Sequence, residues 1–197
     1  MKKIHIASIL IFLFLCSYAS AQNYMTVGAD LDLVFNCDEE VKDEAGLVIP
    51  MPSIFLEYNA FKENKNLGFH YDVHLCYSYS EKDFMLGLSS MIGPVFIIPL
   101  KKESGFFFSS GLTAGFMLGG TIDSKESKDK TLGLGYLGLG GDIKYFFSSG
   151  LTLGLNFTYS PLTYIASVVK ENGQKRNFAK LENSFSAGIS IGYTDYF

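Results

Sequence analysis

The sequence predicts an all-β protein: an eight-stranded antiparallel up-and-down transmembrane β-barrel that follows a cleaved signal peptide. Apolar side chains alternate with small or polar ones through eight segments, which is the period of a β-strand. The links between these segments are alternately short and long. All 20 glycines follow residue 21 and charged residues make up only 18% of the chain, which argues against a coiled coil or a disordered tail.

Residues 1–21 have the pattern of a secretory signal peptide. Two lysines precede an apolar run that ends at Cys16, and Ala19-Ser20-Ala21 provides the small residues that signal peptidase reads. The run is short for a membrane-spanning helix. We therefore expect one domain, residues 22–197. The leader holds two of the 16 bases and none of the 20 acids, so this domain has a net charge of −6, which argues against nucleic acid as a partner.

The clearest strands are the first, the third and the last. In residues 27–35 the odd positions are apolar, whereas the even ones include Asp30 and Asp32. Residues 67–79 alternate without a break, and residues 184–194 repeat the pattern close to the end of the chain. Each of these segments predicts a strand with one apolar and one polar face.

Five further strands are expected around 51–61, 84–100, 106–122, 131–146 and 151–160. The parity of the apolar residues in 131–146 changes near Tyr136, which predicts a β-bulge. Pro94 and Pro99 have no amide hydrogen to donate to a neighbouring strand, so we expect them to disturb the end of 84–100.

The links between the strands predict the orientation of the barrel. The short ones are 62–66, 101–105 and 148–150, and the long ones are 36–47, 123–130 and 161–180, with the brief link 80–83 as the exception. Short turns at one end and long loops at the other are typical of bacterial outer-membrane barrels. Residues 161–180 contain apolar positions that could instead extend a hairpin beyond the membrane or add two strands.

Two other folds use a similar pattern: a soluble β-sandwich, and a helical membrane hairpin over residues 84–122. The small, polar minor face of the strands and the aromatic residues near the strand ends favour the barrel. One aromatic girdle would comprise Tyr24, Phe61, Phe106, Tyr145, Phe146 and Phe197, and the other Phe35, Tyr77, Tyr79, Phe84, Phe116 and Tyr159.

The leader, the alternating strands and the final strand that ends in Phe197 resemble the small bacterial outer-membrane β-barrel proteins of the outer-membrane protein A, X and W type. The resemblance covers residues 22–197. It implies a location in the cell outer membrane, with membrane lipid and lipopolysaccharide as surroundings. It also implies assembly by the barrel-insertion machinery, which reads the final aromatic residue, although Asp195 stands where that signal has an apolar residue. We expect a monomer.

Charged residues on the inward faces predict a polar network in the lumen. Its expected members are Asp30, Asp32, Glu57, His70, Asp72, His74, Asp142 and Lys144. The acids outnumber the single lysine, so the interior should be acidic. Side chains fill the interior of an eight-stranded barrel, so a water-filled pore is not expected.

Three further kinds of chemistry are suggested by single residues. The spacing of His70, Asp72 and His74 could hold a metal ion, but hydrogen bonds within the lumen explain these residues equally well, and we expect no metal and no cofactor. Ser78 lies about 13 Å along the strand from His74, too far for proton transfer, so we expect no enzyme. Cys37 and Cys76 form a possible disulfide, although about 10 Å separates their strands.

These observations favour a structural or surface-interaction role in which a rigid barrel displays its loops. An extracellular ligand would bind at the loops 36–47, 123–130 and 161–180. The resemblance to the outer-membrane protein W type implies another possibility, a narrow channel or lateral transporter for small hydrophobic molecules. A lipid-modifying barrel enzyme is a third.

Overall fold

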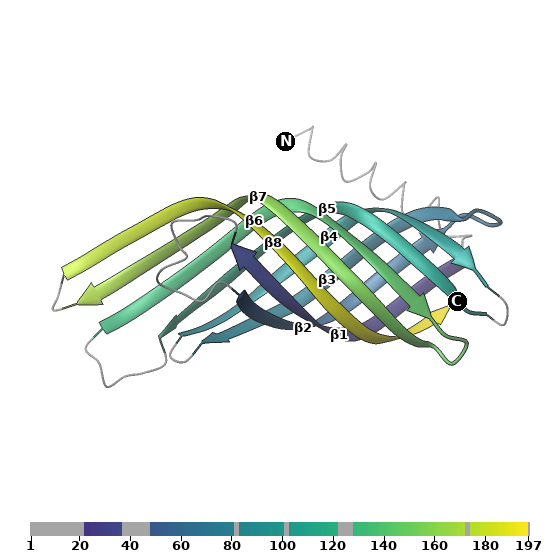
Figure 1. Cartoon of the computed structure of the whole chain (residues 1–197), viewed down its shortest axis with the longest axis horizontal. Coiled ribbons are helices and arrows are strands. Elements are labelled where there is room, and N and C mark those ends of the chain that lie inside the picture. The colour runs from purple at the N-terminus through teal and green to yellow at the C-terminus, as the bar shows by residue number, and fades with distance from the viewer. Residues whose placement is uncertain are drawn as a thin grey trace, which may run out of the picture.

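The computed structural model describes residues 22–36, 48–80, 83–100, 103–121, 128–171 and 174–196. They form one closed antiparallel barrel in which each strand pairs with the next along the chain (Figure 1). The strands are β1 (Gln22–Asn36), β2 (Val48–Phe61), β3 (Leu67–Ser80), β4 (Asp83–Pro99), β5 (Gly105–Thr121), β6 (Lys128–Phe146), β7 (Leu151–Glu171) and β8 (Gln174–Tyr196). The predicted eight-stranded up-and-down barrel is therefore confirmed. The predicted signal peptide lies outside the described residues.

The pairing of the first and last strands closes the barrel. Tyr24 to Asn36 of β1 stand opposite Ser184 to Tyr196 of β8. Residues 84–122 do not form the helical hairpin considered above, because they belong to β4 and β5, which pair from Asp83 and Thr121 down to the turn. In the part of the chain that the structure describes, no helix is long and apolar enough to cross a membrane.

The apolar face of the strands points outward. Ile54, Leu118 and Ile189 are 61%, 62% and 62% exposed, whereas Glu57 and Lys144 are 1% and 2% exposed inside the barrel. A soluble sandwich would bury the aliphatic side chains and expose the charged ones, so that alternative is wrong. Hydrocarbon is the solvent that matches this outer surface, and the barrel is a transmembrane one.

The irregularity predicted near Tyr136 is confirmed, but the extra residue lies on the neighbouring strand. The register between β6 and β7 shifts between Leu137 and Leu139. Ser160 and Pro161 stand between the paired residues of β7, opposite Gly138 alone. A bulge accommodates proline, which has no amide hydrogen to donate.

The two proposed breaks in β4 have a smaller effect than expected. β4 runs continuously to Pro99, and its register against β5 is the same before Ile92 and after Val95. Only the pair positions around Gly93 and Pro94 are missing from this ladder.

The segment 161–180, expected as a long loop, is mostly strand. β7 and β8 have 21 and 23 residues, compared with 14 in β2 and β3. They pair from Leu151 and Tyr193 as far as Glu171 and Gln174, which confirms the extended hairpin and excludes a ten-stranded barrel for the described residues. Most of loop 36–47 and of loop 123–130 lies outside the described residues, and β6 begins at Lys128 within the latter.

A lysine on the outer face tests the membrane assignment. We expect Ile189→Lys, midway along the part of β8 that pairs with β1, to lower the free energy of unfolding in lipid vesicles by about 2–4 kcal/mol, because the ammonium group would enter hydrocarbon. Urea unfolding of the refolded protein measures this. Asn177→Lys, on the exposed hairpin, serves as the control with a change of under about 0.5 kcal/mol. Equal losses in the two variants would contradict the assignment.

Candidate functional site

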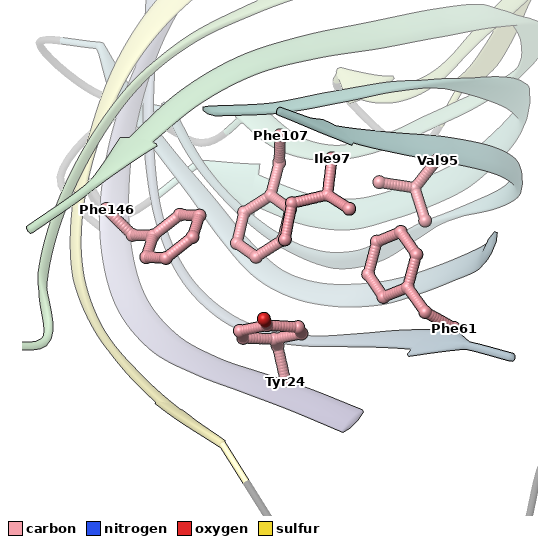
Figure 2. Packing of buried hydrophobic residues seen from close by; sticks show 6 residues of the cluster. All are labelled: Tyr24, Phe61, Val95, Ile97, Phe107 and Phe146. Atoms are coloured by element: carbon pink, nitrogen blue, oxygen red, sulfur yellow. The ribbon is translucent and has the colours of Figure 1, made fainter. Parts of the chain in front are cut away.

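The barrel interior is closed at the short-turn end by an aromatic plug, which we define as Tyr24, Phe61, Val95, Ile97, Phe107 and Phe146. These side chains are at most 7% exposed and point toward one another inside the barrel (Figure 2). The ring centroids of Tyr24 and Phe107 lie 5.1 Å apart, and those of Phe107 and Phe146 lie 4.6 Å apart. The plug thus fills the cross-section of the lumen with apolar side chains.

Three plug residues were expected in the lipid-facing girdle, and that expectation is wrong for Tyr24, Phe61 and Phe146. Strand parity is the signal that would have found them. Tyr24 shares its parity with Asp30, and Phe61 shares its parity with Glu57, so each must point inward with its charged neighbours.

The remaining described girdle residues lie at the two ends of the outer face. The ring centroids of Phe106 and Tyr145 are 4.8 Å apart near the short turns. Exposed rings lie toward the loop end, at Tyr77, Phe84, Phe116 and Tyr159. Phe197 lies outside the described residues.

Three threonine hydroxyls form the next layer of the lumen. Thr194 Oγ1 lies 2.8 Å from Thr26 Oγ1 and 2.5 Å from Thr152 Oγ1. All three side chains are buried. The threonines adjoin both neighbouring groups, because Thr152 stands opposite Phe146 of the plug and Thr26 stands opposite Glu57.

Lys144 and Glu57 form the centre of an ionic layer. Lys144 Nζ donates to Glu57 Oε2 and lies 3.4 Å from Asp142 Oδ2. The same ammonium group sits 4.7 Å from the centroid of the Phe55 ring, a cation–π contact. Ser109 donates a hydrogen bond of 3.0 Å to Asp142. Each group is buried, so each charge depends on these partners.

His70 carries a positive charge in this arrangement. Its Nδ1 lies 2.8 Å from Asn59 Oδ1, and its Nε2 lies 2.9 Å from Asp72 Oδ2. The amide nitrogen of Asn59 donates to Glu57, so Asn59 presents its carbonyl oxygen to the ring. Both ring nitrogens therefore face acceptors, and only the doubly protonated imidazolium can donate to both.

His74 is held in a similar way. Its Nδ1 lies 2.8 Å from Asp30 Oδ2 and its Nε2 lies 3.4 Å from Asp72 Oδ1. Ser53 donates a 2.6 Å hydrogen bond to the other oxygen of Asp30, and the Phe55 ring stacks on the imidazole at 5.3 Å. Two carboxylates within ion-pair distance of one imidazole favour its positively charged form.

The structure brings together all the predicted lumen residues except one. Asp30, Glu57, His70, Asp72, His74, Asp142 and Lys144 share ion pairs. Asp32 lies apart from these pairs, where it accepts a 2.6 Å hydrogen bond from Asn156 Nδ2. Five further residues take part in the contacts above and were not predicted, although they share the inward parity of their strands: Ser53, Phe55, Asn59, Ser109 and Asn156.

The ionic layer uses the groups that a metal ion or a hydrolase would need. Ligand atoms of His70, Asp72 and Asp142 lie within 4.8 Å of one another, but Lys144 already provides a positive charge beside Asp142. Asp30 and Asp72 occupy the ring nitrogens of His74. Among the described residues no hydrogen bond joins His74 to Ser78. The expectation of no metal stays a prediction.

The possible disulfide between Cys37 and Cys76 stays a prediction. Cys76 Sγ is buried and lies 3.4 Å from Ser89 Oγ. Its predicted partner, Cys37, lies outside the described residues. Near Cys76, the side chains of Met51 and Met117 form a small apolar cluster toward the loop end of the lumen, against which Leu134 of β6 packs from inside.

Comparisons with known proteins connect this architecture to solved structures. No protein-family model matches the chain, and no curated protein matches its sequence. A major outer membrane protein from Thermus thermophilus is 13% identical with a TM-score of 0.52, over 88% of this chain and 99% of that one. Ail, the attachment invasion locus protein of Yersinia pestis, is 12% identical with a TM-score of 0.50, over 89% of this chain and 99% of that one.

At such identities the likeness concerns the fold: the chain has the architecture of the small eight-stranded outer-membrane β-barrels. Together with the apolar outer face, this architecture locates the protein in the cell outer membrane.

Removing the buried lysine tests the ionic layer. We expect Lys144→Met to lower the free energy of unfolding by about 3–5 kcal/mol, because Glu57 and Asp142 would keep buried negative charge without its nearest cation. The double variant Lys144→Met, Glu57→Gln should lose less than the single variant. Urea unfolding in detergent measures both. Lys62→Met, at an exposed turn, is the control. A double variant that is as unstable as the sum of the two single ones would contradict the coupling.

The plug and the ionic layer together predict an electrically closed barrel. In planar lipid bilayers the refolded protein should give no steady single-channel conductance, because apolar and ion-paired side chains fill successive layers of the lumen. Stable, resolved conductance steps from the unmodified chain would show that the closure is wrong.

Proposed function

We propose that the protein is a non-catalytic surface-interaction protein, a rigid outer-membrane barrel that presents a protruding β-sheet to a partner outside the cell. One observation carries this proposal: β6, β7 and β8 continue beyond the rest of the barrel (Figure 1). The pairing of β8 with β1 ends at Ser184, yet β8 begins at Gln174. Among the described residues, positions 174–183 therefore pair on one side only, with β7.

The outer edge of a protruding hairpin suits recognition, because a partner can add a strand to it through backbone hydrogen bonds. The barrel holds the base of the hairpin through ladders on both sides of β7, from Leu151 to Tyr159. The protruding sheet is therefore held in one orientation by strand pairing, unlike an irregular loop.

The filled interior supports a surface-interaction role in preference to the transport of small molecules through the lumen. The plug and the ionic layer occupy the short-turn half of the lumen. Above them, in the described part of the lumen, lies a cavity of about 70 Å³, with room for a few water molecules. A narrow channel would need a continuous path past both layers.

The composition of the hairpin favours an anionic partner. Residues 163–182 contain Lys170, Lys175, Arg176 and Lys180 against Glu171 and Glu182, whereas the whole chain has a net charge of −4. A basic extension on an acidic protein attracts anionic groups over a Debye length. Lipopolysaccharide in the outer leaflet and the barrel-insertion machinery during assembly are further proposed partners.

Shortening the hairpin tests the proposed function. Ala166 and Ala179 face each other across it, so residues 167–178 can be replaced by Asn-Gly, which closes a two-residue turn. Cells that display the full chain should bind fluorescent dextran sulfate, and cells with the shortened chain should lose at least about 80% of that binding if the electrostatic attraction resides here. Uncharged dextran of the same size is the control ligand.

A second variant separates charge from the strand edge. Lys170→Gln, Lys175→Gln and Arg176→Gln together keep the hairpin length and remove three positive charges. This variant should lose most of the binding and its dependence on salt. Equal binding by cells with the full and the shortened chain, at equal surface expression, would overturn the proposal.

A further inference from the structure

A small cavity lies in the lumen on the loop side of the ionic layer. Its volume is about 70 Å³, and His74, Asp72 and Asp142 of the ionic layer form part of its wall. Val34, Met51, Met91, Leu134 and Phe157 give the wall an apolar part, and most of the other lining residues carry hydroxyls or amides. They include Ser89, Thr113, Tyr136, Asn156, Thr158 and Ser186, and Asp32 adds a carboxylate.

Asp32 differs from the other lumen carboxylates in its partners. Asp30, Glu57, Asp72 and Asp142 each lie within 4.0 Å of a nitrogen of Lys144, His70 or His74. In the described part of the chain, none of these three cations forms an ion pair with Asp32. Its polar contact is the neutral amide of Asn156, at 2.6 Å. A carboxylate in a barrel interior requires more compensation than one amide donor provides.

The side-chain oxygen of Asn156 is a second group near the cavity that needs a partner. The Nδ2 of Asn156 donates to Asp32, and its Oδ1 is buried with no hydrogen-bond partner among the described residues. Asn156 and Asp32 border the same cavity. The carboxylate of Asp32, the carbonyl oxygen of Asn156 and the hydroxyl oxygens around them are all oxygen ligands that can coordinate a cation.

The charge count of the lumen points in the same direction. Five carboxylates, from Asp30, Asp32, Glu57, Asp72 and Asp142, face three positive charges, from Lys144 and the two imidazolium rings. These groups therefore carry more negative than positive charge. Among them, Asp32 is the carboxylate that has no ion pair with Lys144, His70 or His74.

We propose that this cavity binds a monovalent cation, an alkali-metal or ammonium ion, at Asp32 and Asn156. Asp72 and Asp142 are already paired with His70, His74 and Lys144, so Asp32 contributes one uncompensated negative charge, which suits a singly charged ion. Protein sites for divalent cations commonly combine several carboxylates. The aromatic plug closes the short-turn end, so the ion enters from the loop end. The site is independent of the proposed binding by the hairpin.

Gly188 shows that the backbone is fitted to this carboxylate. It stands directly opposite Asp32 in the β1–β8 ladder. A Cβ added at Gly188 would lie only 2.0 Å from Asp32 Oδ1. Gly188→Ala therefore displaces the carboxylate while it leaves its charge in place.

The test uses the full mature chain folded in detergent micelles. Its Tm is followed while choline chloride, whose cation is too large for the cavity, is replaced by NaCl, KCl or NH4Cl at constant ionic strength. We expect a saturable rise in Tm with at least one of these small cations, because binding to the folded state alone stabilises it. The salt that acts at the lowest concentration identifies the preferred ion.

Three variants make the test specific. Asp32→Asn should abolish the cation-dependent rise, and Gly188→Ala should raise the half-saturating concentration at least tenfold. Asp195→Asn removes an exposed carboxylate outside the lumen and should leave the response unchanged. If the Tm of the wild type is the same in small cations as in choline, the proposal is overturned. This is the result expected if Asp32 holds a proton and binds no cation. An unaltered response in Asp32→Asn would overturn the proposal as well.

Discussion

The closure of β1 against β8 is the constraint on which the rest of the structure depends. In hydrocarbon no water is present to bind an unpaired amide or carbonyl group, so each strand needs a neighbour on both sides. Thirteen consecutive residue pairs between Tyr24–Asn36 and Ser184–Tyr196 meet this need. Closure also divides every strand into a lipid face and a lumen face, and so it forces charged residues such as Glu57 and Lys144 into a narrow interior.

The interior meets that demand by stacking chemically distinct layers. Apolar rings lie next to the turns, hydroxyls follow, and ion pairs occupy the middle. In the aromatic plug and the ionic layer the partners come from strands that are not neighbours in the barrel, such as Lys144 of β6 and Glu57 of β2. These contacts connect opposite walls of the barrel, in addition to the ladders that join neighbouring strands. The layers therefore explain how a chain with few buried aliphatic residues maintains a rigid frame.

The period-two pattern was sufficient to predict the strands, their faces and the inward charged residues, because lipid and lumen impose opposite chemistry on alternate positions. Tyr24, Phe61 and Phe146 were misplaced because aromatic residues near strand ends were assigned to a girdle without regard to parity. The bulge at Pro161 was placed on β6 because the apolar Leu134 suggested a change of face, whereas Leu134 lies inside the barrel against the cluster of Met51 and Met117. Asn156 was missed because an amide gives no signal until its partner across the barrel is known.

The aromatic plug has a consequence for the cell that carries this protein. Apolar side chains fill the short-turn end of the lumen, so no polar path crosses that end. A barrel plugged in this way adds no leak to the membrane that holds it. Under the proposed function, the number of copies in the outer membrane is therefore not limited by the loss of its barrier to solutes.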